Sequence, residues 1–290
     1  MLGIILAGGA GTRLAPLTNV VSKQLLPIYD KPMIYYPITT LMLAGIKEFV
    51  VVVSPEYVEQ YRKLLGDGDK WGIQISLVVQ PNPGGIAQSF ELVPPKFRDQ
   101  DCALILGDNL FYGMGLGASL QTVFSGSGAM IFAYEVSNPG DYGVISFDSE
   151  FAPIRIQEKP SSPESNYAIP GLYFFEKNCY QLAKELTPSL RGELEITDLL
   201  NIYLSRKELA VQILARGTAW LDTGSPENLL SAAAFVQVIE ERQGLKIGCP
   251  EEVAAREGFI SMTEFRTLLQ DLPLNSYRSY LENLNIQFRR

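Results

Sequence analysis

Short runs of β-branched and aliphatic residues alternate with longer segments of helical pattern through the first half of the chain. The runs that predict strands are Gly3–Leu6, Phe49–Val53, Gln74–Val79, Cys102–Leu106 and Ala129–Glu135. The segments between them that predict helices are 32–43, 55–65, 86–92 and 118–123. This alternation indicates βα units, which build a mostly parallel central sheet flanked by helices in a Rossmann-like α/β arrangement.

The pattern changes after residue 140. Three further runs predict strands that are joined by turns without helices between them: Val144–Phe147, Ile154–Gln157 and Gly171–Phe175. The segments 176–186 and 195–205 then return to a helical pattern. We therefore expect the sheet to become mixed in this part of the chain.

The last part of the chain is almost entirely helical in pattern after Trp220. Ser225 and Pro226 form a typical N-cap and first-turn pair, which predicts a helix start at this point. We predict an α/β domain at residues 1–240 and a C-terminal helical appendage at residues 241–290.

The charge balance limits the partners that this chain can bind. Its 24 Lys and Arg residues against 32 Asp and Glu residues give a formal net charge of -8. Nucleic-acid affinity comes largely from phosphate neutralisation by basic side chains, so we expect no nucleic-acid partner. A locally basic pocket can still bind small anions. The chain has no histidine, which excludes Ser-His-Asp triads, Cys-His pairs and HExxH zinc sites.

The N-terminal segment, the lengths of the apolar stretches and the cysteines indicate in which cellular compartment the protein is located. The N-terminal apolar run is short and is followed by glycines, so it predicts a strand and not a signal peptide. No apolar stretch reaches the length of a membrane span, so we expect no membrane association. Cys102, Cys179 and Cys249 are widely separated and odd in number, which favours a reducing cytoplasm over a disulfide framework.

A glycine-rich segment follows the first predicted strand directly. Residues 6–14 read LAGGAGTRL. Glycines let the backbone approach a ligand closely, successive N–H groups can form an anion nest, and Arg13 adds a bidentate phosphate donor. The segment fits neither a Walker A loop nor a complete GxGxxG motif, because Leu14 occupies the third glycine position. Taken alone, it could also be a tight strand-to-loop turn.

The next segments carry a family resemblance. Residues 22–37 read SKQLLPIYDKPMIYYP, which places Lys23 and Gln24 shortly after the glycine loop. Together with LAGGAGTRL, this segment resembles the signature of the sugar nucleotidyltransferases, and of the glucose-1-phosphate thymidylyltransferases in particular. The resemblance continues over essentially the whole chain in the segments 80–88, 106–113, 141–144, 158–160, 171–174, 191–198, 217–224, 242–247 and 249–252. It implies the nucleotidyltransferase fold.

The resemblance also implies a reaction. In this family the phosphate of a sugar 1-phosphate attacks the α-phosphorus of a nucleoside triphosphate and releases pyrophosphate, with dTTP and glucose 1-phosphate as the expected substrates. Positioning and electrostatic stabilisation carry most of such catalysis, so the lack of histidine is no obstacle. The expected cofactor is Mg²⁺, held by Asp108 and Asp222. Asp108 directly follows the strand 102–106, at the edge of the sheet where ligands bind in α/β folds. Considered singly, each aspartate is more often a cap or turn residue.

The other roles also follow from the resemblance. Arg13, Lys23 and Lys159 are the expected catalytic cations, with Lys159 on the sugar phosphate. The expected nucleotide-binding residues are Gly8, Gly11, Thr12, Arg13, Lys23, Gln24, Gln80, Gly85 and Asp108. The expected sugar-binding residues are Asn109, Gly143, Glu158, Lys159 and Ile169, with Tyr142 and Tyr173 as candidate walls of the pocket. Amide side chains and a backbone group can satisfy the acceptor, donor, acceptor edge of thymine.

Several positions depart from the family pattern and leave questions open. Pro170 and Gly140-Asp141 put fine sugar specificity in doubt, and Met114 and Ser225-Pro226 stand where histidine is common. The resemblance implies a homotetramer, as in family members of this short type. It also implies inhibition by a downstream dTDP-sugar such as dTDP-rhamnose. Glu252 and Arg256 could belong to such a regulatory site, but they are equally an ordinary i,i+4 salt bridge.

Two other functions stay open at this point. A uridylyl- or cytidylyltransferase acting on another hexose 1-phosphate would share most of these motifs. A catalytically silent homologue that binds sugar nucleotides as a sensor is the second alternative. A sensor need not keep the metal and leaving-group machinery, so it is disfavoured by the presence of Arg13, Lys23, Asp108, Lys159 and Asp222.

Overall fold

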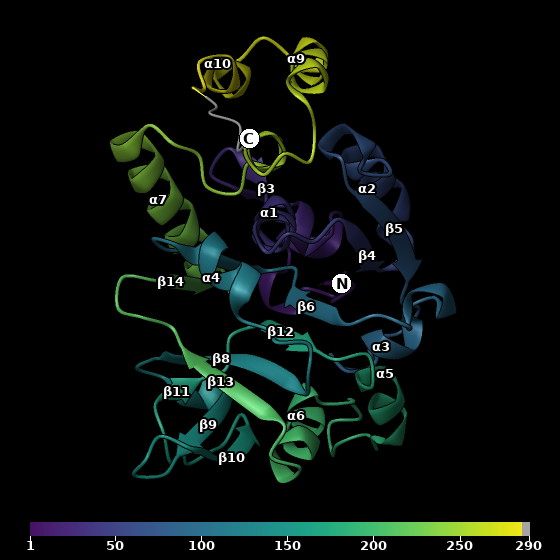
Figure 1. Cartoon of the computed structure of the whole chain (residues 1–290), viewed down its shortest axis with the longest axis vertical. Coiled ribbons are helices and arrows are strands. Elements are labelled where there is room, and N and C mark those ends of the chain that lie inside the picture. The colour runs from purple at the N-terminus through teal and green to yellow at the C-terminus, as the bar shows by residue number, and fades with distance from the viewer. Residues whose placement is uncertain (286–290) are drawn as a thin grey trace.

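The computed structural model describes residues 1–285. Its centre is a mixed sheet with the strand order β10-β9-β11-β8-β12-β6-β1-β4-β5, to which β13 is added beside β8 (Figure 1). One half is parallel and consists of β1 (Leu2–Ala7), β4 (Glu48–Val53), β5 (Gln74–Val79) and β6 (Cys102–Leu106). The predicted parallel strands are therefore confirmed.

The other half of the sheet is largely antiparallel. Its strands are β8 (Ala129–Glu135), β9 (Gly143–Phe147), β10 (Pro153–Glu158), β11 (Tyr167–Ala168), β12 (Leu172–Phe175) and β13 (Leu209–Ile213). Strand β12 runs antiparallel to both β6 and β8 and joins the two halves, whereas β13 runs parallel to β8. The expected change to a mixed sheet after residue 140 is confirmed.

Helices cover both faces of the sheet, because successive strand residues point to opposite sides. Ile5 of β1 and Val51 of β4 face a core shared with α1 (Tyr35–Leu43) and α2 (Val58–Leu65). Their neighbours Ile4 and Val50 belong to the core on the other side, whose helices are α3 (Ser89–Leu92), α5 (Cys179–Leu182) and α6 (Ile196–Ser205). Helix α4 (Leu116–Thr122) contributes Leu120 to the first core.

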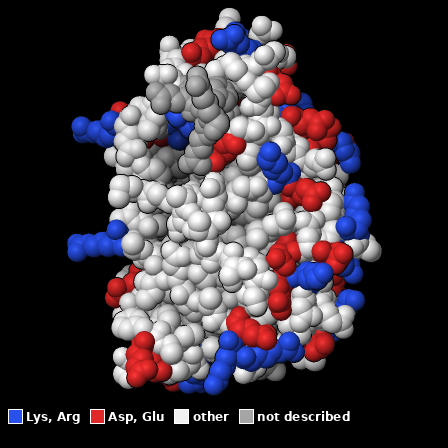
Figure 2. All heavy atoms as spheres, viewed as in Figure 1, with Lys and Arg blue, Asp and Glu red and all other residues white. Residues whose placement is uncertain are grey.

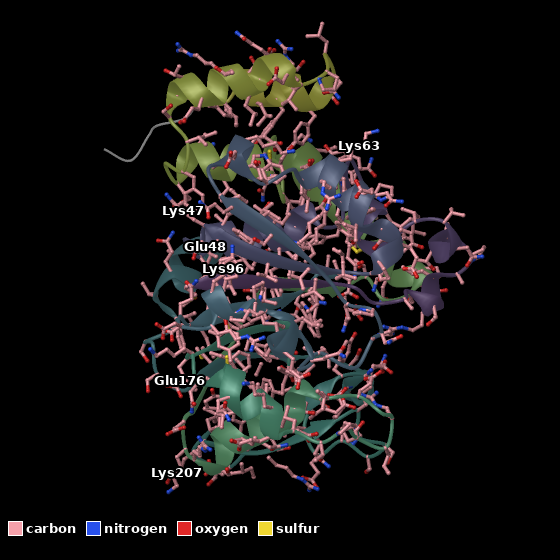
Figure 3. The ribbon with its side chains drawn as sticks, turned by 90° about the vertical axis from the view of Figure 1, so that its right-hand side faces the viewer. Lys47, Glu48, Lys63, Lys96, Glu176 and Lys207 are labelled. Carbon is pink, nitrogen blue, oxygen red and sulfur yellow. The ribbon has the colours of Figure 1, made fainter. Side chains whose placement is uncertain are left out.

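The C-terminal helices are α7 (Pro226–Gln243), α8 (Pro250–Arg256), α9 (Met262–Asp271) and α10 (Ser276–Glu282). The side chain of Ser225 accepts a hydrogen bond from the Asn228 N–H, so the predicted N-cap is confirmed. Helices α9 and α10 form a layer at one end of the molecule, and Lys207 lies at the opposite end (Figure 3). The part of the predicted appendage at residues 286–290 lies outside the described residues.

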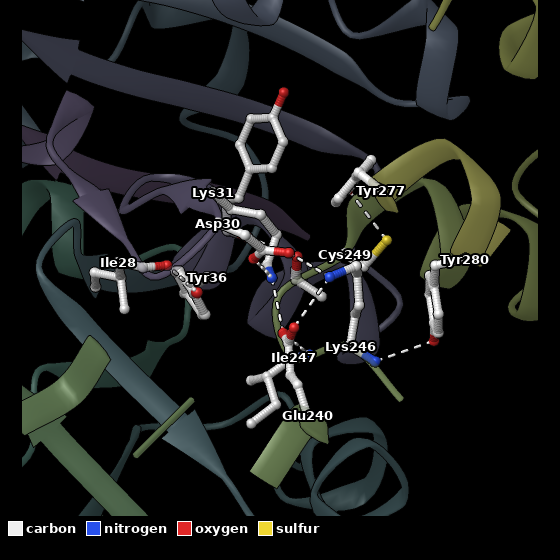
Figure 4. A network of polar contacts seen from close by, with 12 residues as sticks. Ile28, Asp30, Lys31, Tyr36, Glu240, Lys246, Ile247, Cys249, Tyr277 and Tyr280 are labelled. Atoms are coloured by element: carbon white, nitrogen blue, oxygen red, sulfur yellow. Dashed lines mark hydrogen bonds and ion pairs between the residues drawn. The ribbon is translucent and has the colours of Figure 1, made fainter. Parts of the chain in front are cut away.

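A buried ionic cluster ties α7 to the N-terminal half of the chain (Figure 4). Lys31 of β3 (Lys31–Pro32), which pairs with β2 (Pro27–Ile28), is 1% exposed and contacts Asp30 and Glu240. Lys246 contacts the same two carboxylates from the segment between α7 and α8. Two positive and two negative charges therefore compensate one another in a site where an unpaired charge would be costly.

The structure differs from the predicted elements at several points. The helix expected at 32–43 begins only at Tyr35, because Lys31 and Pro32 form β3. The helix expected at 86–92 shortens to α3, since the Ala87 N–H donates to the Leu194 carbonyl instead of continuing a helix. Strand β13 and a short ribbon formed by β7 (Asn109–Tyr112) and β14 (Ala219–Asp222) were not predicted.

The surface carries charges of both signs. On the face shown in Figure 2, basic and acidic side chains are interspersed along one edge, beside a broad uncharged area. This face presents no extended basic surface of the kind that binds nucleic acid. Within residues 1–285, no helix is both long enough and apolar enough to cross a membrane.

Candidate functional site

The glycine loop lies at the carboxyl end of β1. Gly11 has a φ of 61°, and a Cβ at this position would lie 2.9 Å from Cγ2 of Thr18. The Thr18 hydroxyl donates to the Gly11 carbonyl, which holds the loop in this conformation. Only glycine adopts such a left-handed and crowded position without strain, so the loop is a built structure and not merely a flexible turn.

A cavity of about 240 Å³ opens above this loop. We call it the loop cavity; it is lined by Gly9, Gly11, Thr12, Arg13, Lys23, Gln24, Asp108 and Gly224. Lys23 is only 6% exposed and forms an ion pair with Asp108. The cavity therefore combines backbone N–H groups with two cations, an arrangement suited to anions.

The two aspartates converge although they lie far apart in the sequence. Asp222 of β14 stands opposite Asn109 of β7, the residue that follows Asp108. The N–H and the hydroxyl of Thr223 both donate to the Asp108 carbonyl, at 3.2 and 2.9 Å. Burial and then the negative charge of Asp108 raise the pKa of Asp222, against the opposing effect of Lys23 and Arg13. The two carboxylates are thus close enough to repel each other.

A second cavity of about 370 Å³ adjoins the first, and we call it the main cavity. Arg13 and Asp108 line both cavities and mark the boundary between them. Of the other predicted site residues, those that line the main cavity are Asn109, Gly143, Glu158, Lys159, Ile169 and Asp222. The predicted wall residues Tyr142 and Tyr173 also line it.

Glu158 and Lys159 enter the main cavity from the end of β10. Burial and the nearby Glu195 raise the pKa of Glu158, while Lys159 and Arg191 act in the opposite direction. The Arg191 guanidinium lies 3.4 Å from Glu158 and also binds Glu195 at 2.8 Å. This side of the main cavity therefore offers a carboxylate acceptor next to two cations.

Asn109 lines the main cavity next to the two carboxylates. It is 3% exposed, and its Oδ1 accepts hydrogen bonds from the Trp220 indole N–H at 2.6 Å and from the Gly171 N–H at 3.1 Å. Its Nδ2 donates to Oδ1 of Asp108 at 2.9 Å. Because the oxygen is held by two donors, the amide nitrogen must face the aspartate.

The residues predicted to read the base lie in a third group. A Cβ on Gly8 would lie 2.5 Å from Oε1 of Gln80, so these two residues are in contact at the ends of β1 and β5. Gly85 has a φ of 97° and packs against the Leu194 backbone, where a Cβ would lie 2.4 Å from the carbonyl oxygen. Gln24 instead lines the loop cavity, and its Oε1 accepts hydrogen bonds from Ser22 and Tyr61.

Known proteins resemble this chain over nearly its whole length. Residues 2–238 match the nucleotidyl transferase family. The glucose-1-phosphate thymidylyltransferase of Mycolicibacterium smegmatis is 50% identical over 284 residues, which cover 98% of this chain and 99% of the relative. The enzyme of the same name from Neisseria meningitidis is 49% identical over 285 residues, with 98% and 99% covered.

This chain belongs to the glucose-1-phosphate thymidylyltransferase family of nucleotidyl transferases. A crystal structure from Bacillus anthracis, assigned to the same enzymes and determined with sucrose, superimposes with a TM-score of 0.74 at 35% identity, covering 81% of this chain and 95% of that chain. A UDP-glucose pyrophosphorylase bound to UDP-glucose gives a TM-score of 0.71 at 24% identity, covering 82% and 98%. This last likeness shows that the fold is shared.

The family resemblance named the segments 191–198 and 217–224 but gave no role to Arg191, Thr197 or Trp220. Thr197 and Trp220 line the main cavity, and Arg191 contacts Glu158. A signal for Trp220 was available, because it stands two residues before Asp222 in one strand and so points to the same side. Arg191 lies outside regular structure, and only its contact with Glu158 in space reveals its place.

A separate cavity of about 300 Å³ lies between α1, α4 and α8. Its lining includes Lys246, Glu252 and Arg256. Arg256 and Glu252 form an i,i+4 ion pair at 2.7 Å, and Glu252 also accepts a hydrogen bond from the Tyr280 hydroxyl. The pair is thus both an intrahelical salt bridge and part of a cavity wall, and a regulatory role at this position stays a prediction.

Proposed function

We propose that this protein transfers a thymidylyl group from dTTP to α-D-glucose 1-phosphate and releases pyrophosphate. Relatives of this name cover nearly the whole chain at about half identity. The observation that carries the proposal is the position of Asp108 and Arg13 on the boundary between two cavities. A group shared in this way can contact the phosphates of two substrates at once.

The charges of the two cavities fit two anionic substrates. Arg13 and Lys23 would hold the triphosphate in the loop cavity and stabilise the leaving pyrophosphate. Lys159 would hold the sugar phosphate in the main cavity, so that its oxygen faces the α-phosphorus. Holding the two reactants in line removes most of the entropic barrier, and no covalent intermediate with the protein is needed.

Asp108 and Asp222 fit a divalent cation, as the family relationship implies. Burial and then the charge of the nearby Asp108 raise the pKa of Asp222, and a cation would relieve the repulsion between the two carboxylates. We propose that both residues hold Mg²⁺, which prefers carboxylate oxygens together with substrate phosphates. When bound, the ion would neutralise charge on the phosphates. Lys23 already compensates part of the Asp108 charge.

The remaining roles are assigned by position. Gly8, Gly11 and Thr12 would contact the nucleotide through the backbone of the loop. Gln24, Gln80 and Gly85 would contact the base and its neighbourhood, as the family resemblance implies. The sugar would contact Asn109, Gly143, Glu158 and Ile169, with Glu158 accepting hydrogen bonds from sugar hydroxyls.

Turnover of a substrate panel tests this proposal. We expect pyrophosphate release with dTTP and glucose 1-phosphate to exceed release with UTP, CTP or ATP. We expect the Asp108→Asn variant to lose turnover while it stays folded. A higher kcat/KM with UTP or CTP would replace the proposal by the uridylyl- or cytidylyltransferase alternative. Binding of sugar nucleotides without any turnover would support the sensor instead.

The cellular setting is a further part of the proposal. A cytoplasmic location is supported by three buried cysteines without a disulfide. We propose that the protein is a homotetramer. Its C-terminal helical region at 241–290, distinct from the domain at 1–240, would supply apolar side chains to the subunit contacts. Leu245 and Leu274 in this region are 48% and 87% exposed and are suited to such contacts. We propose that the dTDP-glucose made by this protein is used in the synthesis of dTDP-deoxysugars such as dTDP-rhamnose.

A further inference from the structure

We infer that Gln88 determines the base preference of the site by fixing which end of the Gln80 amide faces the base. This inference rests on the proposed function and names a residue that would select the base without contacting it. Gln88 precedes α3 and is only half-buried. Its side chain lies between the Gly84 backbone and the Gln80 side chain.

The orientation of the two amides follows from a backbone group. The Gly84 N–H can only donate, and it lies 2.9 Å from the Gln88 amide, so the Gln88 atom that faces it must be the oxygen Oε1. The same oxygen lies 2.6 Å from the Gln80 amide. The Gln80 atom at this contact must therefore be the donor Nε2. The contacts start at the Gly84 N–H, whose direction is fixed. Reversing either amide would therefore place two donors or two acceptors against each other.

The other end of the Gln80 amide is then an acceptor. Its Oε1 lies over Gly8, where a Cβ would be 2.5 Å away. Gln80 is 8% exposed, and its own N–H donates to the Val53 carbonyl at 2.9 Å, which anchors the residue at the end of β5. Among residues 1–285, no hydrogen-bond donor contacts this oxygen. This oxygen is not among the fully buried side-chain atoms that lack a partner, so it is accessible to a donor from the ligand.

The acceptor at Gln80 separates two classes of pyrimidine. Thymine and uracil carry an N–H at ring position 3, which can donate to Oε1. Cytosine carries an unprotonated nitrogen at the same position, so two acceptors would face each other. A reversed Gln80 amide would present Nε2 and favour cytosine. Gln88 thus selects an imide base by preventing this reversal.

A purely structural role for Gln88 predicts a different result. Gln88 also braces the turn at Gly84 before α3, so its loss could disturb the loop. A disturbed loop would weaken turnover with every nucleotide to a similar extent. Loss of amide orientation instead changes the ratio between dTTP and dCTP. The ratio of the two kcat/KM values is therefore the decisive measurement.

The test compares two variants of the full chain. Gln88→Met keeps the length of the side chain but removes the acceptor, and we expect its kcat/KM ratio of dTTP to dCTP to fall about tenfold or more. Gln88→Glu keeps an acceptor for both donors and should keep the wild-type ratio. Melting temperatures of both variants report any loss of folding.

Each outcome has a defined meaning. The inference would be overturned if Gln88→Met kept the wild-type kcat/KM ratio of dTTP to dCTP, or if this ratio fell in Gln88→Glu. The result for Gln88→Glu is decisive even where Gln88→Met does not fold. A wild-type protein that fails to turn over dTTP would contradict the proposed function instead. If the wild type and both variants prefer dTTP over dCTP to the same extent, the role of Gln88 is rejected. The proposed function then remains intact.

Discussion

The indole N–H of Trp220 donates a hydrogen bond to the side-chain oxygen of Asn109 at 2.6 Å. The second donor to this oxygen is the Gly171 N–H, and the Asn109 nitrogen in turn holds Asp108. One carboxamide therefore links the sugar side of the site to the carboxylate that we assign to the metal. Its orientation depends on both donors, because an amide has only one acceptor end.

Removing the indole donor should impair catalysis more than folding. In Trp220→Phe the ring remains but Asn109 loses one of its two donors, so its amide can rotate and Asp108 loses a fixed partner. We expect kcat to fall about tenfold, as for a lost buried hydrogen bond, with a smaller change in KM for dTTP. Steady-state kinetics check this expectation.

A neighbouring residue provides the matched control. The Tyr134 hydroxyl donates to the Thr218 carbonyl at 3.1 Å, and its ring packs against the same indole. Tyr134→Phe therefore removes a hydrogen bond beside Trp220 without touching Asn109, and it should keep wild-type kcat. Equal kcat values for the two variants would contradict the proposed link.

Replacing Glu158 should affect only one substrate. Glu158→Gln keeps the size of the side chain but removes a charged acceptor, so we expect KM for glucose 1-phosphate to rise about tenfold with little change for dTTP. Glu193→Gln, whose side chain is 46% exposed and lies 3.5 Å from the same Arg191, should behave like the wild type. A parallel rise of KM for both substrates would show that Glu158 does not distinguish the two cavities.

The pH dependence of sugar-phosphate binding provides another check. Burial and the charge of Glu195 raise the pKa of Glu158 above its ordinary value of 4.5. As the pH falls through this raised pKa, the carboxylate becomes protonated and loses its strength as an acceptor. KM for glucose 1-phosphate should therefore rise on the acid side already above pH 4.5, and this rise should be absent in Glu158→Gln. A KM that varies equally with pH in both proteins would argue against this assignment.

Removal of divalent cations should stop turnover and leave the fold intact. A chelator is expected to abolish pyrophosphate release, and Mg²⁺ added in excess should restore it. Asp222→Asn removes one of two carboxylates, so it should require more Mg²⁺ for half-maximal rate, in addition to a lower rate. Turnover that persists at full rate in chelator would exclude the proposed metal.

The buried ionic cluster predicts how stability changes in acid. Burial alone would raise the pKa of Asp30, but hydrogen bonds from Lys246 and Lys31 outweigh burial and lower the pKa below 3.8. Since the carboxyl titrates near its ordinary value in the unfolded chain, the charged form stabilises the fold fully above about pH 5. This stabilisation is lost as the pH falls through the lowered pKa.

Asp30→Asn tests this expectation. At pH 7 the variant should lose about 1 to 2 kcal/mol of unfolding free energy, less than a fully buried pair would lose because the side chain is 27% exposed. The difference from wild type should shrink below about pH 4. Asp99→Asn removes the exposed pair with Lys177 and should leave the denaturation midpoint unchanged. A difference for Asp30→Asn that persists in strong acid would contradict the assignment.

The parallel half of the fold was predictable because its strands are buried on both faces. Runs such as Phe49–Val53 are continuously apolar, which is a signal that a single sequence carries. Strands β7 and β14 gave no such signal. Each has four residues, and their pairing depends on a partner from a distant part of the chain. Short strands of this kind are defined by contacts in space and not by local pattern.

The sequence named many of the residues that line the two cavities, but not how they are arranged. Asp108 could be placed from the residues alone, since it follows a buried strand at the ligand-binding edge of the sheet. The meeting of Asp108 with Asp222 came only from the family resemblance. The contacts of Gln88 and Trp220 could not be foreseen, because an amide orientation depends on the whole set of neighbouring donors and acceptors.

The ribbon of β7 and β14 makes the spacing of the two aspartates a property of one pair of neighbouring strands. Asp222 pairs with Asn109 in register, so a single rung of the ladder, about 5 Å wide, separates the two chain segments that carry the carboxylates. Most of the long intervening stretch lies outside this rung, but Gly171 contacts Asn109 and β12 pairs with β6. Insertions and grafted loops at turns away from Gly171 and β12, such as the turn between β9 and β10, should therefore be tolerated by the metal site itself, even where they reshape the cavity around the sugar.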